Sequence, residues 1–130
     1  MHIIDLLAGN TDHIDQAASI MVTAFADTWS PTLDDALEEV RESLEPGRVS
    51  RVALDDHGQV VGFIAAIPRY GEPPHATGWE LHPLAVDPTR QGEGIGRALV
   101  ADLEQQVAAL GAVTLFAQTD DENGATTLSG

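Results

Sequence analysis

A glycine-rich loop at the start of an amphipathic helix constrains this chain more than any other feature. The loop reads Gln91-Gly92-Glu93-Gly94-Ile95-Gly96 and follows an apolar stretch that stops at Asp87-Pro88. From about Gly94 to Leu110, apolar residues recur at helical spacing. Glycines let the backbone approach a ligand closely, and a helix start offers free N–H groups and a positive dipole end. We expect a phosphate or pyrophosphate site here, since three glycines would be a costly way to begin a helix without a ligand.

Two common phosphate-binding motifs do not match the loop. Arg97 stands where the dinucleotide fingerprint needs its third glycine, and the Gly-Lys-Ser/Thr of the P-loop is absent. The pattern Gln91-x-x-Gly94-x-Gly96 instead resembles the acyl-CoA pyrophosphate loop of the GNAT superfamily of N-acetyltransferases. Arg90 and Arg97 would place cations beside an anionic cofactor in an otherwise acidic chain.

The remaining pattern predicts a single domain over residues 1–130. Periodicity and turn residues indicate strands at 2–7, 49–54, 59–67, 79–86 and 112–117, with a loop at 68–74 and a polar, turn-rich segment at 119–130. They also indicate three helices, which begin after a cap at Asn10 or Thr11, after a cap at Thr32, and near Gly94. The order β-α-α-β-β-β-α-β predicts a mixed α/β or α+β fold around one sheet. Residues 79–117 form a βαβ unit that should cross over right-handed.

Charge and composition narrow the function classes. Lys+Arg number 6 against 21 Asp+Glu, which gives a formal net charge of −15 and argues against nucleic-acid binding. The same field would attract a cationic partner, although acidity alone often serves only solubility. The chain has no cysteine, which excludes disulfides and a cysteine nucleophile. With no basic signal-peptide region and no long apolar run, we expect a cytoplasmic protein without membrane segments.

The strand before the loop carries candidate catalytic groups. Side chains alternate along a strand, so Glu80, His82 and Leu84 should share one face. Acyl transfer needs a neutral amine, and a carboxylate or imidazole there could accept its proton, directly or through water. Taken singly, the carboxylate could equally be a solvated strand residue and the imidazole a packed one. Pro83 cannot donate to a sheet ladder and predicts a bulge or splayed pairing.

A narrower resemblance covers most of the chain. The blocks Trp79-Glu80-Leu81-His82-Pro83-Leu84, Thr119-Asp120-Asp121 and Thr126-Thr127-Leu128-Ser129 are similar to those of aminoglycoside 6'-N-acetyltransferases. The resemblance implies a GNAT fold, with a central, mostly antiparallel mixed sheet and flanking helices. It implies direct acetyl transfer from acetyl-CoA, in a ternary complex, to the 6'-amine of an aminoglycoside.

The resemblance also implies a set of site residues. Glu80 and His82 would lie at the acceptor site, and the backbone N–H of Leu84 would contact the thioester carbonyl. Acetyl-CoA would be bound by Leu84, Ala85, Val86, Arg90, Gln91, Gly92, Glu93, Gly94, Ile95, Gly96 and Arg97. The cationic acceptor would be bound by Trp29, Glu80, His82, Asp120, Asp121 and Asn123. Further acids near the acceptor cleft would be Asp27, Asp34, Asp35, Glu38 and Glu39. No metal ligand set is evident, because His75 and His82 have no matching partners.

The family pattern continues beyond this sequence with a further helix and two strands. That part often carries a tyrosine that protonates the departing thiolate, whereas this sequence has only Tyr70, in the expected loop. Without those strands a sheet edge would lie open, and we expect a homodimer to cover it. The alternatives are that another polypeptide supplies the strands or that the sequence is part of a longer chain. Two alternative functions are acetylation of a different amine, such as a polyamine or a peptide, and CoA binding without turnover.

Overall fold

The fold is built on a six-stranded sheet with strand order β1-β2-β3-β4-β5-β6. The structure, a computed structural model, describes residues 1–71, 76–117 and, for the backbone, 125–127. Its elements are β1 (His2–Asp5), α1 (Thr11–Ala24), α2 (Leu33–Glu42), β2 (Val49–Leu54), β3 (Val60–Tyr70), β4 (Gly78–Val86), the short 3-10 helix η1 (Pro88–Arg90), α3 (Ile95–Ala109), β5 (Thr114–Ala117) and β6 (Ala125–Thr127). The mixed α+β fold predicted from the sequence is therefore confirmed.

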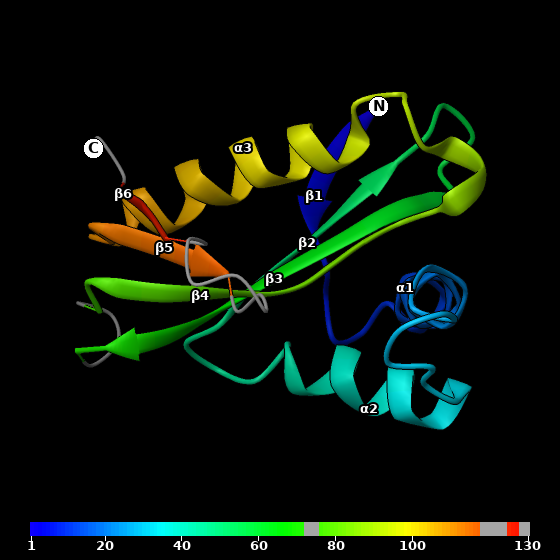
Figure 1. Ribbon diagram of the computed structural model, residues 1–130, viewed down its shortest axis with the longest axis horizontal. Helices are drawn as coiled ribbons and strands as arrows, with labels where there is room; N and C mark the ends of the chain where they lie inside the picture. Colours follow the sequence, from blue (N-terminus) through cyan, green and yellow to red (C-terminus); the bar gives the residue numbers. More distant parts are fainter. Residues whose placement is uncertain (72–75, 118–124, 128–130) are drawn as a thin grey trace.

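The helices cover opposite faces of the sheet. In Figure 1, α3 lies along one face and α1 and α2 lie against the other. Neighbouring strands are antiparallel except β4 and β5, which are parallel because α3 connects them. This is the βαβ unit that the sequence predicts for residues 79–117.

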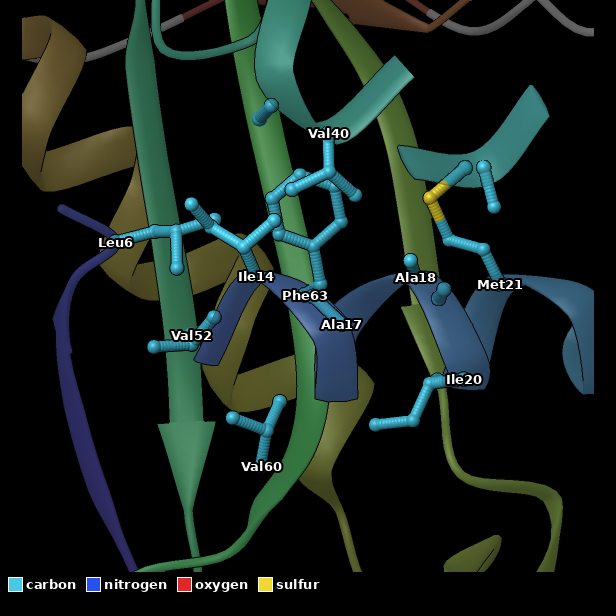
Figure 2. Packing of buried hydrophobic residues seen from close by; sticks show 13 residues of the cluster. Leu6, Ile14, Ala17, Ala18, Ile20, Met21, Val40, Val52, Val60 and Phe63 are labelled. Atoms are coloured by element: carbon cyan, nitrogen blue, oxygen red, sulfur yellow. The ribbon is translucent and has the colours of Figure 1, made fainter. Parts of the chain in front are cut away.

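Each face of the sheet has its own apolar core. On the side of α1 and α2, Phe63 lies beneath Val40 and beside Ile14 and Ala17, as Figure 2 shows. On the side of α3, the fully buried Trp79 packs in one cluster with Leu99 and Leu103. The sheet is therefore packed between two helix layers. Each side chain of β4 faces either α3 or the layer of α1 and α2.

Side-chain caps define where α1 and α2 begin. The side chain of Asn10 accepts a hydrogen bond from the His13 backbone N–H at 3.0 Å. Thr32 and Asp35 form a reciprocal capping box, in which each side chain accepts from the other residue's backbone N–H. The turn between the helices therefore has a defined geometry, and α2 is held against the sheet face that it covers.

Two expected element boundaries are wrong. The third strand continues through Pro68 to Tyr70, so Tyr70 lies in β3 and not in a loop. Pro68 pairs with Trp79 of β4 on one side, whereas the pairing of β3 with β2 ends at Ala66. Proline is tolerated here because it has no N–H to donate, and Pro68 has no partner on the β2 side that would need one. The polar, turn-rich segment expected at 119–130 also contributes a strand, β6, which pairs antiparallel with β5.

A bulge in β4 changes which face its residues occupy. Leu81 lies opposite Ala66 and Leu84 opposite Ile64, so three steps on β4 match two on β3. Leu81 and Leu84 consequently both pack on the α3 side of the sheet. The irregularity predicted from Pro83 is confirmed. The prediction that Leu84 shares a face with Glu80 and His82 is wrong, because the extra residue reverses the alternation.

Candidate active site

The glycine loop has an open surface and an uncapped helix start. Gly92 and Gly94 have φ angles of 88° and 81°, a left-handed conformation that favours glycine. A Cβ added at either position would meet nothing within 4 Å. Gly94 is also the N-cap of α3 and offers no side chain to its first N–H groups. Open space beside a helix start is what a diphosphate needs, so these residues fit the pyrophosphate of CoA.

The two loop arginines differ in their surroundings. The guanidinium of Arg90 donates to Asp55 at 2.9 Å and lies 3.6 Å from Glu93. Arg97 is exposed on the first turn of α3 and forms no ion pair with the residues that the structure describes. Arg97 can therefore meet an anionic ligand directly, whereas the charge of Arg90 is already matched by carboxylates.

Glu80 is a buried carboxylate with a cationic partner. Its exposed fraction is 4%. Nε and Nη2 of Arg69 donate to its Oε1 and Oε2, each at 3.3 Å. A buried carboxylate needs such pairing, because desolvation otherwise disfavours its charge. Glu80 lies opposite Ile67 on β3. Because strand side chains alternate, Ile67 shares a face with Phe63 and Ala65, which pack in the core on the side of α1 and α2. Glu80 therefore lies on that face.

His82 reaches the same helix layer. Its Nε2 lies 2.9 Å from Oε1 of Glu39 on α2, and its side chain is 47% exposed. Glu80 and His82 thus stay together on the face of α1 and α2, as predicted, while Leu84 faces α3. The side chain of Leu84 therefore lies away from the two polar groups, so the expected contact with a carbonyl would have to come from its backbone N–H.

The exposed acids of α2 form an anionic surface on the helix that contacts His82 through Glu39. A hollow of about 460 Å³ lies along the helix. It is lined by Asp34, Leu37, Glu38, Arg41, Glu42 and Glu45. Asp35 belongs to the capping box, and the backbone N–H of Thr32, followed by its hydroxyl, holds the pKa of that carboxyl below its usual range. Asp35 is thus already engaged in holding the start of the helix.

The sequence also matches a protein-family model. The model described as the acetyltransferase (GNAT) family matches residues 14–127. This chain belongs to the GNAT acetyltransferase family.

Solved structures similar to this GNAT chain include aminoglycoside 6'-N-acetyltransferases. One, complexed with coenzyme A, is 38% identical with a TM-score of 0.80, over 93% of this chain and 63% of that one. A type Ii enzyme is 37% identical with a TM-score of 0.79, over 95% of this chain and 75% of that one. An enzyme from Enterococcus faecium is 37% identical with a TM-score of 0.76, over 90% of this chain and 61% of that one. The chain thus spans less than two thirds of the length of the first and third of these. No curated protein matches it.

Trp29 is placed where a ligand could reach it. In the turn between α1 and α2 of this GNAT chain its side chain is 49% exposed, and its ring lies 6.1 Å from that of Phe25. Asp27 is exposed in the same turn. The other predicted acceptor residues, Asp120, Asp121 and Asn123, lie outside the described residues.

Two residues at the site were not singled out by the sequence patterns: Arg69, which pairs with Glu80, and Asp55, which holds Arg90. Glu39 was expected as one of five acids near the acceptor cleft, and the structure shows that it contacts His82. Extending the third strand past Pro68 would have placed Arg69 opposite β4. The contacts of Asp55 and Glu39 join distant parts of the sequence, and no local spacing reveals them.

The described part of the chain shows three further points about this GNAT domain. None of its helices is long and apolar enough to cross a bilayer. Among the same residues there is no group of three or more His, Cys, Asp or Glu side chains that could hold a metal ion. Tyr70, at the end of β3, is 64% exposed, and its ring lies 5.9 Å from that of Phe116 on β5.

Proposed function

We propose that this GNAT chain transfers the acetyl group of acetyl-CoA to a primary amine, and that the acceptor is the 6'-amine of an aminoglycoside. The observation that carries the proposal is the course of β4. This strand presents Glu80 and His82 to the face covered by the acidic helix α2, and then runs into the open glycine loop. An acceptor site and a diphosphate cradle are therefore supplied by one continuous stretch of chain.

The loop residues would hold the cofactor. The backbone at Gly92 and Gly94 and the first N–H groups of α3 would face the diphosphate, and the exposed Arg97 would add a cation. When bound, acetyl-CoA supplies an acetyl group activated as a thioester. The backbone N–H of Leu84, at the bulge before the strand ends, would polarise the acetyl carbonyl.

The polar groups of β4 would prepare the acceptor. A primary amine is mostly an ammonium ion near pH 7 and must lose a proton before it can attack a carbonyl. Glu80 or His82 would accept that proton, directly or through water. The sequence has no cysteine, so transfer would go directly to the amine and not through a thiol intermediate.

Electrostatics favour a polycationic acceptor. The formal net charge is −15, and the acids of α2 lie on the helix that contacts His82. Such a surface raises the local concentration of cations and speeds their encounter. Aminoglycosides and polyamines both meet this requirement. The names of similar structures, at 37–38% identity, favour the first.

Initial rates on matched acceptors test the proposal. Release of free thiol from acetyl-CoA would be followed with kanamycin, with spermidine, and with a kanamycin analogue that has a hydroxyl in place of the 6'-amine. We expect release with kanamycin, little with spermidine and none with the analogue. Faster release with spermidine than with kanamycin would identify a polyamine as the acceptor in place of an aminoglycoside. No release with any amine, together with retained CoA binding, would mean that the chain binds CoA without turnover. The solution mass would show whether it acts as the expected homodimer.

A further inference from the structure

Glu39 differs from the other acids of its helix. On α2, Asp34, Asp35, Glu38 and Glu42 are exposed, whereas Glu39 is half-buried beside Val40, which packs into the core. Its side chain is 24% exposed, and its Oε1 lies 2.9 Å from Nε2 of His82. Glu39 is therefore turned toward the sheet and away from the solvated side of the helix.

The contact with Glu39 determines which nitrogen of His82 carries a proton. A neutral imidazole has one donor nitrogen and one acceptor nitrogen, and an ionised carboxylate can only accept. Nε2 must therefore carry the hydrogen that Oε1 of Glu39 accepts. Nδ1 then keeps its lone pair and is the only basic position left on the ring.

The two polar residues of β4 are not equally available. Both oxygens of Glu80 are engaged by Arg69, and Glu80 is 4% exposed. His82 is 47% exposed and engaged at one nitrogen. A proton acceptor for an incoming amine must be reachable and must have a free lone pair. His82 meets both conditions better than Glu80.

We propose that Glu39 is the positioning residue of His82 and that it fixes the Nε2–H tautomer, so that Nδ1 accepts the proton of the acceptor amine. This assignment rests on the proposed function for its catalytic consequence. In the step, an N–H bond of the ammonium breaks and an Nδ1–H bond forms, while the electron pair stays on the amine nitrogen. The resulting imidazolium is stabilised by Glu39 and later releases its proton to water.

Imidazole NMR on the whole chain tests the positioning directly. Ring nitrogen signals distinguish the two tautomers, and the His82 signals are assigned by their absence in His82→Gln. In the wild-type protein we expect His82 to be predominantly the Nε2–H form. Glu39→Leu should shift it toward a mixture of tautomers. Glu38→Leu, one residue away on the exposed side of the helix, should leave it unchanged.

Steady-state kinetics of Glu39→Leu and Glu39→Gln test the catalytic consequence. We expect Glu39→Leu to lower kcat by about ten- to a hundredfold, within the range of general-base effects, with KM for acetyl-CoA unchanged. Glu39→Gln keeps an acceptor oxygen but loses the charge, so its kcat should lie between those of Glu39→Leu and the wild type. It also keeps the test usable if Glu39→Leu folds poorly.

The outcomes separate this inference from the proposed function. A predominantly Nδ1–H form in the wild type, or a tautomer population unaffected by Glu39→Leu, would overturn the positioning role whatever the activity. Unchanged kcat in Glu39→Leu would overturn its catalytic role. If the tautomer responds as expected but the wild-type chain acetylates no amine, the proposed function fails and the positioning of His82 by Glu39 stands.

Discussion

The guanidinium of Arg90 donates to a carboxylate oxygen of Asp55 at 2.9 Å, and this contact joins the glycine loop to the turn of the β2–β3 hairpin. The other oxygen of Asp55 accepts the backbone N–H groups of His57 and Gln59, at 2.8 and 3.0 Å. One carboxylate thus shapes the hairpin turn and anchors the residue before Gln91. The conformation of the loop therefore depends on a residue remote from it in sequence.

Asp55→Asn should weaken CoA binding. Asparagine keeps an oxygen for the two turn N–H groups but presents an amide to Arg90, so the ion pair is lost. Arg90 is partly exposed, so the pair is partly screened by solvent, and its loss should lower the affinity by no more than about fivefold. Titration calorimetry with CoA measures this. Asp56→Asn removes the same charge from a side chain that is 91% exposed and should leave the affinity unchanged. Equal effects of the two substitutions would contradict the anchoring role.

The stabilising effect of Asp55 should depend on pH. The hydrogen bond from the backbone N–H of Gln59, then that from His57 and the charge of Arg90, hold the pKa of this carboxyl below its usual value. A group with a lowered folded-state pKa stabilises the native state above its unfolded-state pKa, about 4, and loses that effect as the pH falls through the folded value. The difference in unfolding free energy between wild type and Asp55→Asn should be constant above about pH 5 and shrink below about pH 4. Urea unfolding from pH 3 to 7 checks this, and a difference that stays constant throughout would refute it.

Gly94→Ala should impair both stability and cofactor binding. An alanine in the left-handed conformation at φ 81° costs about 1 kcal/mol, and its methyl group enters the open space at the helix start. Gly111→Ala is the matched control. Gly111 follows the other end of α3, has a φ of 95° and also has nothing within 4 Å of an added Cβ. Both variants should unfold more easily, and only Gly94→Ala should bind CoA less tightly, by about tenfold. Equal CoA affinity in the two would argue against the loop as the diphosphate site.

Glu80→Gln should retain CoA binding and acetylate more slowly. The substitution leaves Arg69, which is about half exposed, without its anionic partner on the face where an ammonium ion must approach. Repulsion should then raise KM for the acceptor and reduce kcat/KM by about tenfold or more. Steady-state kinetics with the acceptor varied at saturating acetyl-CoA measures this. Unchanged kcat/KM would show that Glu80 has no role in binding or activating the acceptor.

The sequence predicts the local features of the fold well. Glycine spacing, helix periodicity and the apolar strands place the loop between β4 and α3, because these signals depend on neighbouring residues alone. Strand alternation along β4 holds for Glu80 and His82. It fails for Leu84, since a bulge depends on how two strands pair.

The contacts that organise the site come from tertiary packing. Asp55 with Arg90 and Glu39 with His82 each join elements that only the folded sheet brings together. The sequence shows the acids of α2 as one cluster. The rotation of the helix on the sheet turns Glu39 inward and leaves its neighbour Glu38 in solvent. That rotation is set by burial of Ala36 and Val40.

The most direct test is to identify the product formed from kanamycin by the whole chain with acetyl-CoA. Mass spectrometry and NMR of the recovered antibiotic would show whether an acetyl group has been added and on which nitrogen. The proposal predicts one acetyl group, on the 6'-amine, with an equal amount of free CoA. Unmodified kanamycin, or acetylation at a different amine, would contradict it.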